Sequence, residues 1–383
     1  MADSAALGAT KSARNDEFYT QYGDIEAEMN AYVEYDPDVF RGKTVLLPCD
    51  DPEWSEFTRY FACNFECFGL KKLISTSYAK SAGSRQLTFF EQSSPRNDEA
   101  KHPTRGKLFT LTHDTDGSGN IDADDIELSG YLEGDGDFRS AEVTRLRDEA
   151  DIIVTNPPFS QFRDFLAWIL EGKKQFVIIG NVNAISYKDV FPLLKENRAW
   201  LGYSIHSGDR KFHVPDDYPL DAATCGVDPD GRKYIYVKGV RWFTNIDHGQ
   251  RHEPLLLETM ANNLKFNRKL RKKLMDEYGK LEFPTYVNYD AIDVPFTECI
   301  PSDYYGEMGV PITFLDKYDP DQFEIIGTSL DLAKPMQSLA SKGSFLQGGN
   351  RFYTLGLTDK DRENGFSYHR EYDRILIRAK RRP

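Results

Sequence analysis

The sequence has few cysteines and no long apolar run, and both absences exclude classes of protein. Its 383 residues include five cysteines, which are scattered and form no CxxC pair. Neither a disulfide framework nor a zinc site is therefore predicted. Cys63 and Cys67 are one helical turn apart, and we expect them to be small buried helix residues. No segment approaches the roughly 18 apolar residues that a membrane span needs, so no membrane partner is expected.

The first residues also lack the features of a targeting segment. Residues 1–14 are polar and rich in Ala and Ser, without the positively charged start and apolar stretch of a secretory signal. We expect these residues to be disordered and the protein to be cytoplasmic, in a bacterial or phage-infected cell.

A net positive charge is absent as well, but the charge is unevenly distributed. The formal net charge is −13, and residues 98–151 hold 15 acidic against 6 basic residues. Residues 232–275 reverse this balance, with 11 Lys or Arg against 3 acids, and the last fifteen residues add six basic residues against two acids. Local clusters of Lys and Arg matter more for phosphate binding than the total does. The basic stretch is either a nucleic-acid contact or a solvated helix, and the charge pattern leaves both open.

Short apolar runs alternate with amphipathic stretches over the first half of the chain. This alternation predicts an α/β fold with a mostly parallel, doubly wound sheet and right-handed crossovers. Such sheets bind ligands at the carboxyl ends of their strands. The predicted strands are residues 44–48, 72–77, 151–155 and 176–180, and the predicted helices are residues 55–68 and 160–171.

The alternation fades after about residue 202, where we expect a second, less regular lobe. The residues there suggest a strand within 233–243 and a basic helix around 262–278. Residues 315–327 and 373–378 resemble strands that could pair with each other.

The segment Asp151–Phe159 (DIIVTNPPF) carries the clearest chemical signal. An exocyclic amine conjugated to a base ring is a poor nucleophile, so an enzyme must favour its pyramidal form in the transition state. The amide oxygen of Asn156 and the backbone carbonyl of Pro157 can both accept hydrogen bonds from such an amine. Pro157 and Pro158 would hold these acceptors rigid, and Phe159 offers a face on which an extruded base can stack.

Other interpretations of this segment remain open. A strand that ends in a Pro-Pro turn occurs in many proteins without any catalytic role. The same acceptors would suit adenine in DNA, adenine in RNA or a protein glutamine, and a catalytically silent DNA-binding relative is a further alternative. Methylation at cytosine C5 is disfavoured because it would need a cysteine nucleophile in this position.

Several blocks together with this segment resemble the EcoRI-type adenine-specific DNA methyltransferases, over residues 15 to about 327. The family implies a Rossmann-like class I methyltransferase sheet and transfer of a methyl group from S-adenosylmethionine to N6 of adenine in double-stranded DNA. A solitary role and a role beside a cognate restriction endonuclease both remain open. The matching blocks are residues 15–20 (NDEFYT), 47–52 (LPCDDP), 134–140 (GDGDFRS), 242–249 (WFTNIDHG) and 308–317 (MGVPITFLDK).

The resemblance also implies positions for the cofactor and a division of the chain. Residues 15–205 would form the S-adenosylmethionine-binding catalytic domain, and residues 206–383 would supply the remaining sheet strands and the target-recognition region. The cofactor would lie over the ends of the first two strands, and Asp50 or Asp51 would meet its ammonium group. The residues implied in cofactor binding are Phe18, Tyr19, Thr20, Pro48, Cys49, Asp50, Asp51, Ser75, Thr76, Asp137 and Phe138.

A second pattern is independent of the family. Residues 114–125 (DTDGSGNIDADD) match the twelve-residue EF-hand loop, with glycine at position six and an apolar residue at position eight. Position twelve is Asp instead of the usual bidentate Glu, and the residues before the loop resemble a strand. We expect one structural Ca²⁺ in a loop inserted between two strands; the alternative is a solvated Gly-Asp-rich turn. The expected ligands are Asp114, Asp116, Ser118, Asn120, Asp122 and Asp125.

The basic stretch provides the candidate DNA contacts. We expect its cations to bind phosphates and not to read bases. His206, His213, His248 and His252 match no metal-ligand spacing, and we expect them to be satisfied or close to DNA. The expected DNA-binding residues are Arg251, Arg268, Lys269, Arg271, Lys272 and Lys273.

Overall fold

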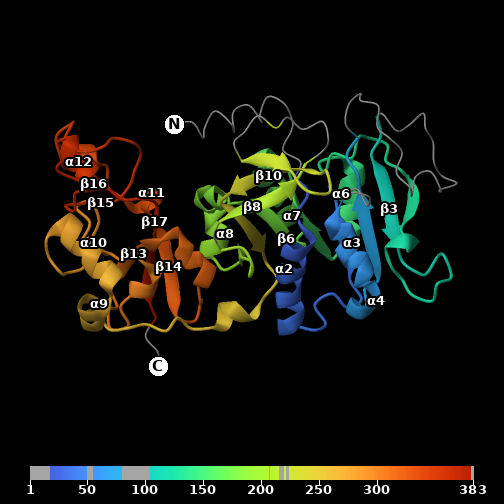
Figure 1. Ribbon diagram of the computed structural model, residues 1–383, viewed down its shortest axis with the longest axis horizontal. Helices are drawn as coiled ribbons and strands as arrows, with labels where there is room; N and C mark the ends of the chain where they lie inside the picture. Colours follow the sequence, from blue (N-terminus) through green and yellow to red (C-terminus); the bar gives the residue numbers. More distant parts are fainter. Residues whose placement is uncertain are drawn as a thin grey trace. The chain divides into compact units, whose positions relative to one another are not determined.

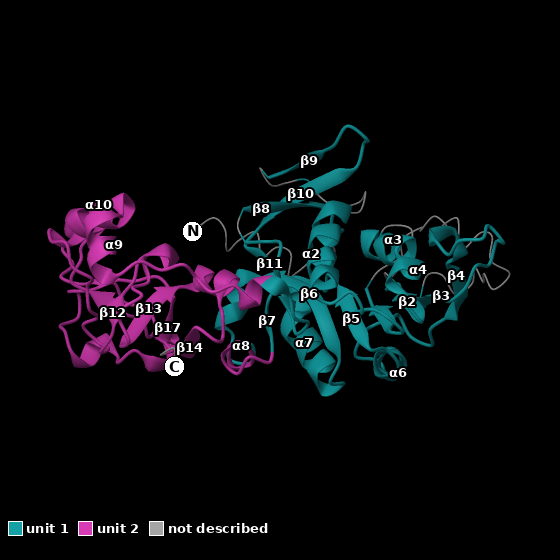
Figure 2. Ribbon diagram, turned by 90° about the horizontal axis from the view of Figure 1, so that it is seen from below, with its two compact units in different colours: residues 1–190, 199–249 teal, residues 191–198, 250–383 magenta. Residues whose placement is uncertain are grey.

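The computed structural model describes residues 18–49, 55–79, 104–206, 208–214, 220 and 224–380. The chain divides into unit 1, Met1–Val190 with Ala199–Gly249, and unit 2, Phe191–Arg198 with Gln250–Pro383 (Figure 2). The predicted boundary after residue 205 therefore falls inside unit 1, while the roles assigned to the two regions stay predictions. Residues 1–14, which we predicted to be disordered, lie outside the described residues.

Unit 1 is built on an eight-stranded mixed sheet in the order β4-β3-β2-β1-β5-β6-β11-β7 (Figure 1). The four central strands β2, β1, β5 and β6 are parallel, whereas the pairings of β3, β4, β11 and β7 are antiparallel. The prediction of a mostly parallel sheet thus holds at the centre and fails at the edges. The strands are β1 Thr44–Leu47, β2 Lys72–Thr76, β3 Lys107–Leu111, β4 Glu127–Tyr131, β5 Ile152–Thr155, β6 Gln175–Asn181, β7 Trp200–Leu201 and β11 Val240–Thr244.

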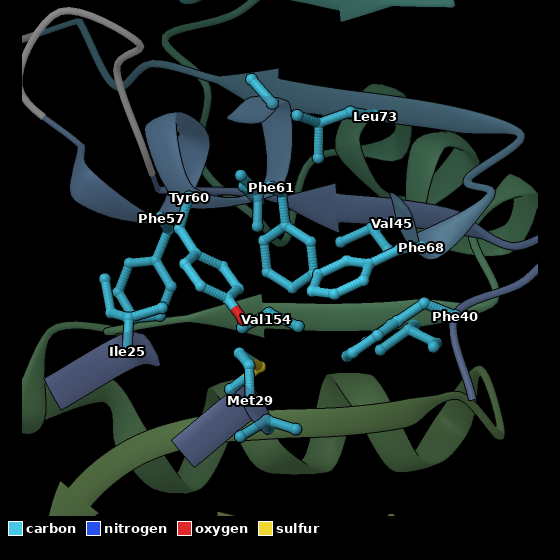
Figure 3. Packing of buried hydrophobic residues seen from close by; sticks show 14 of the residues in the cluster. Ile25, Met29, Phe40, Val45, Phe57, Tyr60, Phe61, Phe68, Leu73 and Val154 are labelled. Atoms are coloured by element: carbon cyan, nitrogen blue, oxygen red, sulfur yellow. The ribbon is translucent and has the colours of Figure 1, made fainter. Parts of the chain in front are cut away.

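Both faces of the central strands are buried. Val154 belongs to the main hydrophobic core, while Ile153, which alternates to the opposite face of β5, is also fully buried. Figure 3 shows Ile25 and Met29 converging on the aromatic rings of Phe57 and Tyr60 and on Val154. These near-continuous apolar strands fix the position of whatever follows their carboxyl ends.

Two helices of unit 1, α3 Glu56–Cys63 and α6 Ala141–Glu149, begin at a serine whose side chain caps the helix. Ser55 accepts a hydrogen bond from the Thr58 backbone N–H at 3.3 Å, and Ser140 accepts one from Val143 at 3.2 Å. The predicted helix 55–68 is confirmed as two consecutive helices, α3 and α4. The helices are α2 Tyr22–Tyr35, α3 Glu56–Cys63, α4 Phe65–Phe68, α6 Ala141–Glu149 and α7 Phe162–Glu171.

The prediction that Cys63 and Cys67 are buried is wrong, because both are exposed. The helical face that packs on the core is taken by larger rings, those of Phe57, Tyr60 and Phe61. A position one turn from its partner can still lie on the solvent side when aromatic residues occupy the apolar stripe.

A second, three-stranded sheet of unit 1 has the order β8-β10-β9. Residues 233–243, expected as one strand, form two, since the chain turns at Gly239 with a φ of 70°. The first joins the small sheet and the second joins the large one. The strands are β8 Asp209–His213, β9 Cys225–Val227 and β10 Lys233–Lys238.

Unit 2 carries a four-stranded sheet in the order β12-β13-β17-β14 and a two-stranded sheet, β15 with β16. The expected pairing of the two C-terminal strands is confirmed, because β14 and β17 are antiparallel neighbours, although residues 315–322 lie outside β14. The strands are β12 Ile292–Asp293, β13 Glu307–Pro311, β14 Phe323–Thr328, β15 Tyr353–Thr354, β16 His369–Arg370 and β17 Arg374–Ala379. The helices are α8 Phe191–Lys195, α9 Met260–Phe266, α10 Arg268–Tyr278, α11 Ser329–Leu332 and α12 Asp359–Glu363. Over the described ranges, no helix is both long and apolar enough to cross a membrane.

A buried charge cluster lies in unit 2. The Arg374 guanidinium donates to Asp293 at 2.8 Å and to Glu371 at 2.9 Å, and all three side chains are at most 7% exposed. One cation thus faces two carboxylates. Burial, together with the charge of Asp293, raises the pKa of Glu371 to about 7.

This shift predicts that the Glu371 carboxyl makes the protein less stable as pH rises. Its pKa is higher in the folded state than in the unfolded chain, so its stabilising contribution is complete below about pH 4.5 and is lost through about pH 7. The free energy of unfolding falls by at most about 3 kcal/mol over this pH range. Calorimetry between pH 5 and 8 should show that the melting temperature depends less on pH in Glu371→Gln than in wild type. Glu363→Gln, at an exposed acid of α12, should leave the dependence unchanged; equal slopes in all three proteins would contradict the assignment.

Candidate active site

Asn156 stands directly after the central strand β5, at the carboxyl edge of the parallel part of the sheet. Pro157 is buried, and the chain turns at once into a short 3₁₀ helix, Phe159–Gln161. The Pro158 carbonyl accepts the Gln161 N–H at 2.9 Å and so closes this turn. Each proline fixes its own φ, which leaves the segment little freedom to move.

The Asn156 side-chain amide is anchored through its nitrogen. Nδ2 donates a hydrogen bond of 2.7 Å to the Phe18 backbone carbonyl. The amide oxygen Oδ1 is buried and accepts no hydrogen bond from the described residues. A buried acceptor without a donor is uncommon and costs roughly 1–3 kcal/mol. Asn156 therefore holds an acceptor ready for a donor that the described chain does not supply.

Phe18, whose carbonyl holds this amide, also brings aromatic rings together. The Phe18 ring meets Phe159 edge to face, with ring centroids 5.6 Å apart, and it lies 5.9 Å from the Phe212 ring. Two residues further on, Thr20 is only 3% exposed, and its hydroxyl also has no partner among the described residues. Segment 18–20 thus contributes a second orphaned polar atom close in sequence to the carbonyl that holds Asn156.

The predicted cofactor residues at the carboxyl ends of β1 and β2 are partly engaged within the protein. The Pro48 carbonyl accepts the Thr76 hydroxyl at 2.9 Å, and the Ser75 and Thr58 hydroxyls are 3.3 Å apart. Ser75 and Thr76 are almost completely buried, so their hydroxyls already serve the fold. Cys49 is half-buried, whereas Asp50 and Asp51 lie outside the described residues.

The predicted cofactor residues Asp137 and Phe138 are engaged with the protein itself. Asp137 forms a two-pronged ion pair with Arg139, at 2.9 and 2.6 Å, which lowers the pKa of the Asp137 carboxyl. The Phe138 ring packs against Phe165 and Trp168 of α7, with centroids 5.0 and 5.6 Å apart. Phe138 is 4% exposed, which leaves little of its ring for a ligand.

Comparison with known proteins places this site in a family. The family described as adenine-specific methyltransferase EcoRI matches residues 6–380. The chain is 41% identical to the Type II methyltransferase M.EcoRI of Escherichia coli, over 84% of this chain and 88% of that protein. It is 34% identical to M.MpnI of Mycoplasma pneumoniae, over 86% of each chain. It is also 31% identical to M.MgeORF184P of Mycoplasma genitalium, over 96% of each chain. No solved structure matches.

The chain belongs to the EcoRI-type adenine-specific DNA methyltransferases. This confirms the resemblance seen in the sequence and favours DNA adenine over the RNA, protein and silent alternatives. DNA is the substrate of the family, and S-adenosylmethionine is the cofactor expected of it. The orphaned atoms of Asn156 and Thr20 are compatible with polar ligands at this edge of the sheet.

In this methyltransferase the loop that matches an EF-hand joins β3 to β4, as expected. Carboxylate oxygens of Asp114, Asp116 and Asp125 lie within 4.8 Å of one another. Asp114 accepts the Gly117 and Gly119 backbone N–H groups at 2.6 and 2.8 Å, and these bonds lower the pKa of its carboxyl. The remaining predicted ligands, Ser118, Asn120 and Asp122, follow in the same loop.

The predicted DNA-binding cations of the methyltransferase fall into two groups. Arg251 is buried, and its guanidinium donates to Asn197, so it is held inside unit 2. The others lie on the first two turns of α10. Arg271 donates to the Leu264 carbonyl at 2.8 Å, and Lys273 pairs with Glu277 at 2.7 Å.

The other three cations of α10, Arg268, Lys269 and Lys272, are exposed. Lys269 pairs with Glu298 at 3.2 Å. Arg268 and Lys272 have no ion-pair partner among the described residues. These two are therefore the cations of α10 best placed to meet an external anion.

Two features of the site have no signature in the sequence. Phe18 was expected to contact the cofactor, but its backbone carbonyl also orients Asn156. A backbone atom carries no signature in the residue type, so no sequence pattern could have indicated this contact. The hydrogen bonds of Gln21 and Asp228 to His213 have no sequence signature either, because both residues are distant from His213 in the chain.

Proposed function

We propose that Asn156 Oδ1 and the Pro157 carbonyl form the acceptor pair that prepares N6 of a flipped-out adenine in duplex DNA for methylation. The observation that carries the proposal is the Asn156 amide, whose nitrogen is committed to Phe18 while its buried oxygen has no donor among the described residues. An adenine amine has two N–H donors, and two fixed acceptors would direct its lone pair out of the ring plane.

S-adenosylmethionine, when bound, supplies the electrophilic methyl group. Phe18, Tyr19, Thr20, Pro48 and Cys49 would hold it at the carboxyl edge of β1, with Asp50 or Asp51 as the predicted partner of its ammonium group. The amine nitrogen would form a bond to the methyl carbon as the sulfonium C–S bond breaks, S-adenosylhomocysteine would leave, and the methylated amine would then release one proton to solvent. Phe159 would stack on the extruded base. No covalent intermediate and no strong general base are needed.

The strand order supports a more specific assignment of the fold. We infer that the sheet of unit 1 is a Rossmann-like class I methyltransferase sheet, whose parallel centre β2-β1-β5-β6 is extended by antiparallel β11 and β7. Ligands of such sheets bind beyond the carboxyl ends of the central strands, where both Pro48 and Asn156 stand. Unit 2 would be the target-recognition lobe. We also keep as predictions that the protein is cytoplasmic and that it acts beside a cognate endonuclease.

The loop 114–125 supports a second, structural proposal, namely one bound Ca²⁺. Three carboxylates within 4.8 Å repel one another unless a cation or a proton offsets their charge. The backbone bonds to Asp114 and the lowered pKa of its carboxyl favour the charged form. Oxygen ligands at these spacings suit Ca²⁺.

Asn156→Ala should reduce the single-turnover rate of methyl transfer by a factor of about 100 or more, because one of the two acceptors is lost. The affinity for S-adenosylmethionine should change by less than about threefold, since residues 18–20 lose the bond to Asn156 but keep the backbone bridge between Tyr19 and His213. Rapid-quench transfer of a labelled methyl group to duplex DNA measures the rate. The exposed Asn364→Ala serves as the control; a variant at position 156 that keeps wild-type turnover would refute the mechanism.

Arg268→Ala combined with Lys272→Ala should weaken DNA binding and make it less dependent on salt. If both cations contact phosphates, the slope of log K against log salt concentration should become shallower by roughly 2. Lys360→Ala, an exposed cation among the acids of α12, is the matched control and should leave the slope as it is. Fluorescence anisotropy at several salt concentrations gives the slopes, and parallel lines for wild type and the double variant would exclude phosphate contacts.

Titration with Ca²⁺ up to millimolar concentration should release or absorb heat and raise the melting temperature. Asp116→Ala should remove both effects, whereas Asp124→Ala, beside the proposed ligands, should retain them. If wild type shows neither heat nor thermal stabilisation, the loop is a solvated turn.

A further inference from the structure

The orientation of the Asn156 amide is set by the chemistry of its partner. An asparagine side chain can turn over by 180°, which exchanges its donor and acceptor ends. The Phe18 carbonyl can only accept hydrogen bonds, so only Nδ2 can face it at 2.7 Å. The acceptor role proposed for Oδ1 therefore depends on the place of the Phe18 carbonyl, which belongs to a segment far from β5 in sequence.

Strand β8 holds that segment. Tyr19 and His213 form an antiparallel bridge, in which the Tyr19 N–H donates to the His213 carbonyl at 2.8 Å and the His213 N–H donates back at 3.1 Å. On one side of this bridge, the Phe18 ring contacts Phe212. On the other side, the Gln21 side chain is 3.2 Å from Nδ1 of His213. Residues 18–21 are thus attached to β8 through Phe18, Tyr19 and Gln21.

The His213 ring connects this segment to the turn at residues 228–232, which follows β9. Its Nε2 lies 2.9 Å from Asp228 Oδ2, and because a carboxylate only accepts, Nε2 carries the proton. In the neutral ring Nδ1 is then an acceptor and receives the Gln21 amide. Burial lowers the pKa of His213, which favours this neutral form. Asp228 Oδ1 accepts the backbone N–H groups of Asp230 and Arg232 at 3.1 and 2.9 Å.

We propose that His213 is a positioning residue for methyl transfer, which holds residues 18–21 so that the Phe18 carbonyl keeps the Asn156 oxygen turned toward the adenine amine. The inference rests on the proposed function of Asn156. In this proposal the three-stranded sheet of unit 1 keeps the Asn156 side chain in one of its two orientations. The side chain of His213 is 12% exposed and that of Asp228 is 6% exposed, as suits a fixed support.

The test compares His213→Ala, His213→Gln and Gln21→Ala in the full-length enzyme with duplex DNA and S-adenosylmethionine. At saturating DNA and cofactor, His213→Ala should lower kcat about tenfold or more, because small displacements of a catalytic group are costly. KM for DNA should stay within about threefold of wild type. His213→Gln, whose amide can still donate to Asp228, should recover part of the loss. Gln21→Ala removes the other side-chain bond and should lower kcat in the same direction.

The matched control is His369→Ala, which breaks a His–Asp pair of similar burial in unit 2, where His369 Nδ1 lies 2.6 Å from Asp361. Its melting temperature should fall about as much as that of His213→Ala, with kcat retained. The proposal is overturned if His213→Ala and Gln21→Ala both keep kcat within twofold of wild type, or if His369→Ala loses kcat equally. If Asn156→Ala also retains turnover, the proposed function itself fails, whereas loss of turnover in Asn156→Ala alone rejects only the role of His213.

Discussion

The hydrogen bond from the Asn156 amide nitrogen to the Phe18 carbonyl joins two parts of the chain that are 138 residues apart. Everything proposed for the site follows from this bond, because it commits one end of the amide and leaves the other without a donor among the described residues. In folded proteins a buried polar atom without a partner is kept only where something offsets its cost. A substrate amine that supplies the missing donor would offset it.

The second constraint is the rigidity of the strand that presents Asn156. Strand β5 is fully buried and lies between β1 and β6, parallel to both. Its end cannot shift without disturbing apolar contacts on both faces of the sheet, since protein interiors are close-packed. The two prolines extend this rigidity for two more residues. The chain therefore combines a fixed acceptor on the sheet with an orienting carbonyl that comes from elsewhere.

The sequence was sufficient to predict the elements whose signals are local. The apolar runs around Val45, Val154 and Ile178 became the central strands, and the Asn-Pro-Pro-Phe segment stands at the sheet edge where a ligand is expected. The pairings of the edge strands were not predictable, because hairpin and crossover connections can join similar apolar runs. The burial of Phe138 against α7 was also not predictable from the sequence. An aromatic residue after an acidic turn is equally suited to a ligand contact and to packing in a core.

Contacts between distant residues were beyond the reach of sequence patterns. His213 was expected to be either satisfied or close to DNA, and it is hydrogen-bonded, but neither its partner Asp228 nor its bridge to Tyr19 has a local signature. Such contacts depend on which strands become neighbours, which is settled only when the whole sheet forms. Residue type led to the proposal that Asn156 is the acceptor, whereas the fold determines what holds its side chain.

The start of helix α10 shows a local rule that the chain violates. Asn267 caps the helix by accepting the Leu270 N–H at 2.9 Å, yet the first turn contains no acidic residue. Cations there oppose the positive end of the helix dipole, which costs a few tenths of a kcal/mol each. Arg271 offsets part of this cost by donating to carbonyls at the end of α9, but exposed Arg268 and Lys272 have no such partner among the described residues. Natural sequences mostly break local rules where function requires it. A phosphate that approached the start of α10 would turn the same charges and the same dipole into attraction, which supports the proposal that Arg268 and Lys272 contact the DNA backbone.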